Sequence, residues 1–130
     1  MVSDASALIE YLLGTDAAGP VRDILRLPDV DLHVPALCDV EVVSGLRRAT
    51  RRRLLSDRRA AEALDDYVDL PLSRHGHRSL LARVFELRAN FSAYDATYVA
   101  LAERIGAELL TADERLGRAV RAQSAVATIP

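Results

Sequence analysis

Short apolar segments alternate with helical patterns along the whole chain, and this order restricts the fold more than any other feature. Apolar runs bounded by turn residues predict short strands within residues 1–4, 31–35, 67–72, 107–113 and 125–129. Helical periodicity and capping residues predict helices over about 5–13, 17–27, 36–50, 54–66, 76–89, 92–105 and 114–122. Strands that alternate with helices form parallel sheets with right-handed crossovers. We therefore expect an α/β fold of three layers, in which helices cover both faces of a mostly parallel sheet of four to five short strands.

Length and composition indicate one domain over residues 1–130, because no linker or repeat divides the chain. Half of the residues are apolar and 28% are charged, as in a globular protein, and no apolar run approaches the roughly 18 residues of a membrane helix. The first residues lack a basic leader and a cleavage site, so we expect a cytoplasmic protein without a membrane partner. We predict that Cys38 packs in the core, and that His75 and His77 lie in a solvated turn without a third metal ligand.

Two acidic residues, Asp4 and Asp113, directly follow predicted strands and precede predicted helices. Ligands of open parallel sheets bind beyond the carboxyl ends of the strands, so both carboxylates should reach one rim if their strands are neighbours. Helix capping explains each residue equally well. Asp4 has the position of an N-cap, and Thr111 with Glu114 forms a capping box around Asp113.

Two further carboxylates, Asp95 and Glu41, lie within predicted helices. Ser92 followed by Asp95 fits a capping box, so a local role suffices for Asp95. Glu41 lies past the first turn of its helix among small and apolar neighbours, where little of the helix-dipole stabilisation remains. If it is buried, it needs a partner or a cation, whereas an exposed helix edge would leave it without such a role. Gly45, one turn later, leaves room for a ligand.

Convergence of these four carboxylates would require a counter-charge, because four anions in one pocket cannot all remain ionised without one. A divalent cation such as Mg²⁺ or Mn²⁺ suits a set of oxygen ligands. One ion would activate a water molecule, and a second would help to hold the attacking and leaving oxygens of a phosphodiester. The predicted metal-binding and catalytic residues are Asp4, Glu41, Asp95 and Asp113.

Four segments, "VSDASALIEYLLG", "DVEVVSGLRR", "LRANFSAYDATYVALAE" and "LLTADERL", together resemble the PIN-domain ribonuclease toxins of type II toxin–antitoxin modules, the VapC-like family. The resemblance spans nearly the whole chain and implies an endoribonuclease that uses Mg²⁺ or Mn²⁺ at the four acidic residues. It also implies that Ser6 and Thr111 orient Asp4 and Asp113, and that Asn90 hydrogen-bonds within the site. Finally, it implies a homodimer that a co-encoded VapB-like antitoxin inhibits, in a heterotetramer or a larger assembly.

The charge of the chain is unevenly distributed. Residues 47–59 hold seven Arg and one Asp, whereas the whole chain has a net charge of −2. RNA that approaches an acidic metal site needs positive charge nearby, so we expect Arg47 and Arg48, two turns beyond Glu41, to contact RNA. Few aromatic residues are available for base stacking, which favours a structured target such as transfer or ribosomal RNA. A solvated helix face explains the same arginines, and the others in the run are equally suited to RNA or to the antitoxin.

Two alternative functions follow from the same residues. A non-catalytic PIN-like module would bind RNA or a protein without turnover and without metal. A phospho-accepting signalling domain also clusters Asp residues at strand ends around Mg²⁺, but such sites use a Lys to hold the phosphoryl group, and this chain contains none.

Overall fold

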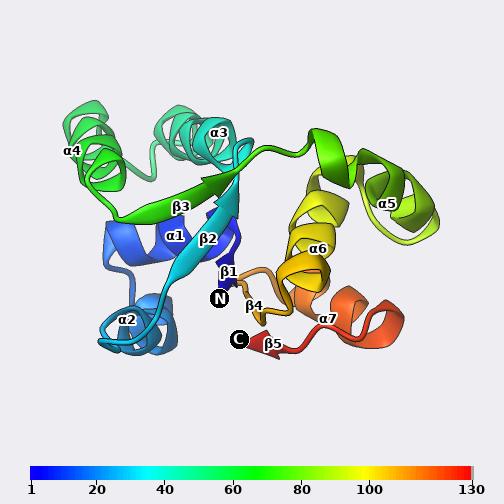
Figure 1. The fold of residues 1–130 in the computed structure, drawn as a ribbon. Helices are drawn as coiled ribbons and strands as arrows, with labels where there is room; N and C mark the ends of the chain where they lie inside the picture. Colours follow the sequence, from blue (N-terminus) through cyan, green and yellow to red (C-terminus); the bar gives the residue numbers. More distant parts are fainter. Residues whose placement is uncertain (130) are drawn as a thin grey trace.

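The computed structural model describes residues 1–129 as an α/β fold around a five-stranded parallel sheet (Figure 1). The strands are β1 (Val2–Ser3), β2 (Leu32–Pro35), β3 (Leu72–His75), β4 (Leu109–Leu110) and β5 (Thr128–Ile129). Their order across the sheet is β3-β2-β1-β4-β5, and every neighbouring pair is parallel. The predicted fold class and sheet type are confirmed.

Seven α-helices and three short 3₁₀ helices connect the strands in residues 1–129. The α-helices are α1 (Ala5–Leu13), α2 (Gly19–Leu25), α3 (Cys38–Arg51), α4 (Asp57–Val68), α5 (Leu81–Glu86), α6 (Ala93–Ile105) and α7 (Glu114–Gln123). The 3₁₀ helices are η1 (Asp16–Ala18), η2 (Arg78–Leu80) and η3 (Leu87–Ala89). Helices α1 to α4 pack against one another, while α5 packs on α6 and α6 packs on β1, β2 and β4 (Figure 1). The sheet therefore lies between two helical layers.

The chain order places a crevice at the carboxyl end of β1. From β1 the chain moves to β2 and β3 on one side, and then returns to β4 and β5 on the other side of β1. Such a reversal separates the helices that follow the two neighbouring strands and opens a binding crevice between them. Asp4 directly follows β1, and Asp113 lies three residues beyond β4, so both carboxylates lie at this reversal point.

The core runs through the sheet and the inner faces of α1, α3 and α6. Helix α6 is the most deeply buried helix, because all residues from Ala96 to Ala102 are buried. Helix α1 places Ala7, Leu8 and Leu12 in the interior, so its apolar stripe serves the core. The Cys38 thiol is fully buried, as predicted, and burial raises its pKa to about 11. None of the helices in the described part of the chain is long and apolar enough to cross a membrane.

The structure corrects the prediction of a strand over residues 67–72. Helix α4 continues through this segment to Val68 because Tyr67 is buried on its inner face, and the strand begins only at Leu72. As a result, His75 does not lie in a turn but ends β3, where its Nε2 lies 2.9 Å from Nδ1 of His33 on β2.

Two predicted helices are also divided in the structure. The segment 76–89 consists of η2, α5 and η3 instead of one helix. The segment 17–27 contains η1 followed by α2, and Pro20 lies in the first turn of α2. Pro is compatible with a first turn because the amide it lacks would have no partner within the helix there.

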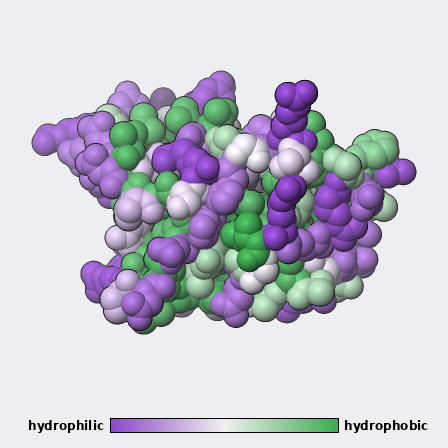
Figure 2. Space-filling view, viewed as in Figure 1, coloured by the Kyte–Doolittle hydropathy of each residue, from purple (hydrophilic) through white to green (hydrophobic). Residues whose placement is uncertain are grey.

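Figure 2 shows the surface of the molecule from the same side as Figure 1. Hydrophobic side chains are visible between β2 and α6, while hydrophilic ones cover much of the periphery.

Candidate functional site

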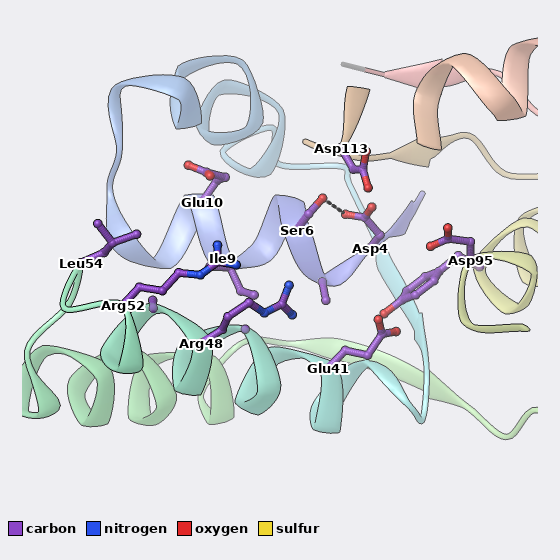
Figure 3. Close-up of a pocket in the computed structure, with 14 residues that line it drawn as sticks. Asp4, Ser6, Ile9, Glu10, Glu41, Arg48, Arg52, Leu54, Asp95 and Asp113 are labelled. Carbon is purple, nitrogen blue, oxygen red and sulfur yellow. Dashed lines mark hydrogen bonds between the residues drawn. The ribbon is translucent and has the colours of Figure 1, made fainter. Parts of the chain in front are cut away.

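A pocket of about 370 Å³ opens at the carboxyl end of β1 and brings together all four predicted carboxylates (Figure 3). Each of them comes from a different part of the chain: Asp4 precedes α1, Glu41 lies on α3, Asp95 on α6, and Asp113 precedes α7. The other lining residues are Ala5, Ser6, Ile9, Glu10, Gly45, Arg48, Ala49, Arg52, Leu54 and Tyr98. The structure therefore brings the four predicted side chains together at one rim.

Asp4 is the most buried of the four carboxylates, with 4% of its surface exposed. Its Oδ1 accepts hydrogen bonds from the Ser6 hydroxyl at 2.7 Å and from the Ala7 amide at 2.9 Å, and its Oδ2 accepts one from the Thr111 hydroxyl. The bond from Ala7 makes Asp4 the N-cap of α1. Burial raises the pKa of Asp4 and the negative charge of Asp113 adds to this effect, whereas the three hydrogen bonds oppose it.

Glu41 is partly buried, and its Oε1 has no hydrogen-bond partner although it is shielded from solvent. The hydroxyl of Tyr98 is likewise buried without a partner that meets hydrogen-bond geometry. Burial raises the pKa of Glu41, the Tyr98 hydroxyl beside it acts in the opposite direction, and the nearby charges of Asp95 and Asp4 raise the pKa further. The exposed helix edge considered for Glu41 is therefore absent at this oxygen, and its polar neighbour, the Tyr98 hydroxyl, does not form a well-oriented hydrogen bond with it. Because α3 begins only at Cys38, Glu41 lies in the first turn of this helix and not past it as predicted.

Asp95 and Asp113 both form ion pairs with the guanidinium of Arg115. Nη2 of Arg115, on the first turn of α7, lies 3.0 Å from Oδ2 of Asp95 and 3.3 Å from Oδ2 of Asp113. Asp113 also accepts the Leu116 amide at 3.1 Å as the N-cap of α7, and the Ser92 hydroxyl caps α6 by accepting the Asp95 amide. The sequence interpretation did not include Arg115, because its contact with Asp95 depends on how α6 and α7 lie together.

Of the three residues predicted to support the carboxylates, Ser6 and Thr111 lie beside Asp4, whereas Asn90 lies outside the pocket. Ser6 and Thr111 both contact Asp4, and Thr111 additionally accepts the Asp113 amide at 3.0 Å. The predicted capping box of Thr111 and Glu114 is wrong, because Asp113 itself is the N-cap and the Thr111 hydroxyl turns to Asp4 instead. Asn90 is exposed at the end of η3 and does not line the pocket.

Two arginines of α3 and the turn after it form the basic side of the pocket. Arg48 lies two turns from Glu41 and lines the pocket as expected, and Arg52 lines it as well, whereas Arg47 does not (Figure 3). Gly45 lines the pocket, as expected, and its lack of a side chain also leaves room for Ile9 of α1. A Cβ atom there would lie 2.3 Å from Cδ1 of Ile9, so glycine permits the close approach of α3 to α1.

The donor set suits a hard divalent cation. All four carboxylates offer oxygen ligands, and the unpaired Oε1 of Glu41 is a costly arrangement that a cation would relieve. Within residues 1–129 no three His, Cys, Asp or Glu side chains already lie close enough to share an ion. Asp95 and Asp113 instead face Arg115, so a shared ion requires side-chain rearrangement around this arginine.

The fold and this acidic crevice define the class of protein, and comparison with known sequences agrees. A sequence model of the PIN domain matches residues 1–122. Ribonuclease VapC9 of Mycobacterium tuberculosis H37Rv is 41% identical over 130 residues, which cover all of this chain and 98% of VapC9. Ribonuclease VapC3 of the same strain is 42% identical and covers 92% of this chain and 86% of its own length. The chain therefore belongs to the PIN-domain family and, within it, to the VapC ribonucleases.

Solved structures agree on the fold. M. tuberculosis VapC20, described as a sarcin–ricin loop cleaving toxin, aligns with a TM-score of 0.68 at 16% identity and covers 91% of this chain and 93% of its own. A toxin–antitoxin complex from Klebsiella pneumoniae contains a chain with a TM-score of 0.58 at 19% identity, covering 86% and 85%. At these identities the likeness concerns the fold alone.

Proposed function

We propose that this protein is the toxin of a type II toxin–antitoxin module and cleaves RNA endonucleolytically with Mg²⁺ or Mn²⁺. The observation that carries the proposal is the convergence of Asp4, Glu41, Asp95 and Asp113 on one pocket in which a buried oxygen of Glu41 has no well-formed hydrogen bond. Local capping explains Asp4, Asp95 and Asp113 one by one, but it does not explain why Glu41 is unpaired beside them.

The four carboxylates would hold the metal in this proposal. Ser6 and Thr111 fix the orientation of Asp4, and the Leu116 amide fixes that of Asp113, so these two ligands are positioned before a cation arrives. Once bound, the cation would lower the pKa of a coordinated water and neutralise charge on the phosphate. Asn90 is not included, because its exposed position keeps it out of the pocket.

Arg48 and Arg52 would bind the RNA backbone beside the acidic centre. Both are exposed and line the pocket, which is the position from which a guanidinium can contact a phosphate. Arg47 lies outside the pocket and is proposed only as a contact with more distant parts of the RNA. A structured RNA is the proposed target, and the description of VapC20 as a sarcin–ricin loop cleaving toxin supports this class of substrate.

A VapB-like antitoxin is the proposed inhibitor, as the resemblance to the VapC-like toxins implies, and a chain of the same fold occurs in the K. pneumoniae toxin–antitoxin complex. We propose that the toxin acts in the cytoplasm as a homodimer and forms a heterotetramer or a larger assembly with the antitoxin. Exposed apolar side chains on α5 and α6, among them Leu81, Phe85 and Tyr94, are available for such contacts.

The test combines Mn²⁺ titration by calorimetry with an RNA cleavage assay on purified protein. Asp95→Asn is the informative variant, because its amide retains the size of the side chain and the Asp95 backbone amide still bonds to Ser92. We expect weaker Mn²⁺ binding and a loss of cleavage of at least about a hundredfold, with an unchanged melting curve. Cleavage at the wild-type rate would remove Asp95 from the site, and RNA binding without any turnover in the wild type would favour a non-catalytic module.

A further inference from the structure

A second cavity, of about 490 Å³, adjoins the acidic pocket on the side of α7 and β5. Asp113 and Glu10 line both cavities, so the two are neighbours that share these carboxylates. Two arginines line each cavity: Arg48 and Arg52 the first, and Arg118 and Arg121 the second. The function proposed above involves only the first cavity and gives the second one no role.

The second cavity combines an apolar wall with a fixed guanidinium. Pro20 and Ile129 supply the wall, whereas Val21 beside them is only 2% exposed. Arg121 is held in place because its Nη1 donates to the Thr128 hydroxyl at 2.9 Å. The guanidinium passes over Gly117, where a Cβ atom would lie only 3.3 Å from the same nitrogen.

Three carboxylates, Glu10, Asp113 and Glu114, also line the cavity, so its two arginines are the groups that would attract a phosphate. With the apolar wall beside them, they match one nucleotide of an RNA strand. A base or ribose has flat or weakly polar surfaces that can lie on an apolar wall, and its phosphate can bind arginine. Arg118 is exposed and makes only a distant ion pair with Glu114, at 3.7 Å, so it is available for a second contact. The anchored Arg121 is already positioned, which reduces the entropy lost on binding.

We propose that this second cavity binds the nucleotide next to the phosphodiester that is cut, with Arg121 and Arg118 on its phosphate and Pro20 and Ile129 against its base or ribose. The inference rests on the proposed function for the identity of the strand. It assigns the path of the RNA across the molecule. The strand would run between Arg48 and Arg52 at one end and α7 at the other, past Asp113. An acidic segment of a protein partner would also be attracted to the arginines, but it would not need the apolar wall beside them.

The test is an NMR titration in Mg²⁺ buffer with adenosine 5′-monophosphate, which needs no cleavage. We expect shifts of the amide signals of Ala112, Gly117 and Ile129 in the wild type. Arg121→Gln should weaken binding about tenfold, the effect of one charge-assisted hydrogen bond. Thr128→Val should weaken it less, because the charge remains and only its anchor is lost. Arg88→Gln is the matched control, since Arg88 lines neither cavity and should leave binding unchanged.

Further probes separate the possible occupants. Adenosine and inorganic phosphate should each bind more weakly than the monophosphate, because each offers only one of the two contacts. Shifts with poly-glutamate but none with the monophosphate would overturn the proposal in favour of a protein segment. Equal binding by the wild type and Arg121→Gln would also overturn it.

An RNA cleavage assay then distinguishes this proposal from the proposed function. If the protein binds the nucleotide in a way that depends on Arg121 but does not cleave RNA, the proposed subsite is supported and the proposed nuclease function is refuted. Active enzyme whose RNA affinity keeps its salt dependence in the Arg118→Gln, Arg121→Gln double variant would refute the subsite alone. We expect the double variant to lower the slope of log affinity against log salt by roughly one to two units.

Discussion

The two walls of the acidic pocket differ in how completely their polar groups are paired. On the wall formed by β1 and β4, Asp4 accepts three hydrogen bonds and Asp113 is held as a helix cap. On the wall formed by α3, Glu41 has an unpaired buried oxygen, and Arg48 projects into the pocket (Figure 3). The carboxylates of the first wall are therefore already held by hydrogen bonds, and we call it the organised wall. On the α3 wall, the buried Glu41 oxygen has no well-formed hydrogen bond.

This difference indicates how the protein combines a stable fold with a reactive pocket. Two of the three donors to Asp4, Ser6 and Thr111, also connect the segments that follow β1 and β4, so they contribute to the fold as well as to the pocket. Glu41 contributes no such bond and is expected to reduce stability until a cation binds. The following substitutions test the two walls separately, beginning with the largest expected effect.

Thr111→Val should be the most damaging change on the organised wall. It removes the donor to Oδ2 of Asp4 and the acceptor for the Asp113 amide, while it keeps the volume of the side chain. A buried acceptor without a donor costs about 1–3 kcal/mol, and loss of a group that orients a metal ligand lowers affinity about 10–100-fold. Urea denaturation and Mn²⁺ calorimetry measure the two effects.

Thr97→Val provides the matched control for that variant. Thr97 is also buried, but its hydroxyl donates to the Ala93 carbonyl within α6 and contacts none of the carboxylates. Its replacement should leave Mn²⁺ affinity unchanged. Equal losses of metal affinity in both variants would show that the organised wall has no specific role.

Glu41→Gln should stabilise the metal-free protein, in contrast to the loss expected for Thr111→Val. The pKa of Glu41 is raised in the folded state, so the folded protein binds its proton more tightly than the unfolded chain does. Wild-type stability therefore falls as pH rises from the unfolded pKa through the folded one, and the glutamine variant lacks this loss. The difference should be small below pH 4 and on the order of 1 kcal/mol at neutral pH, the scale of an unpaired buried group.

Urea denaturation of both proteins in EDTA across this pH range measures the effect. Saturating Mg²⁺ should reverse the order and make the wild type the more stable protein, because the cation binds the carboxylate but not the amide. A variant that is less stable than the wild type at neutral pH without metal would contradict the interpretation of the α3 wall.

The organised wall was largely predictable from the sequence, and the α3 wall was only partly so. Asp4 and Asp113 follow apolar strands directly, and parallel strands align their carboxyl ends, so local patterns suffice to place both. Glu41 was recognisable because its helix neighbours offer no partner. Its unpaired oxygen depends on how α6 packs against α3, which no spacing in the sequence encodes.

Other features were missed for similar physical reasons. The strand over 67–72 was misplaced because burial of Tyr67 extends α4, and burial is a property of the tertiary structure. Asn90 was placed in the site by resemblance, but η3 ends with its side chain exposed. Arg115 reaches Asp95 across 20 residues of sequence, a contact that only the juxtaposition of α6 and α7 creates.

Arg115→Gln should have the smallest effect on stability and should connect the two walls. Its ion pairs with Asp95 and Asp113 are largely exposed on the arginine side, so their loss should cost no more than about 1 kcal/mol. Because Arg115 occupies the carboxylates that the cation would use, its removal should raise Mn²⁺ affinity severalfold at low ionic strength. Arg58→Gln, which breaks an exposed pair with Glu62, should change neither quantity measurably. Weaker Mn²⁺ binding in Arg115→Gln would instead mean that the arginine holds Asp95 and Asp113 in the geometry that the cation needs, and that the organised wall extends to α6.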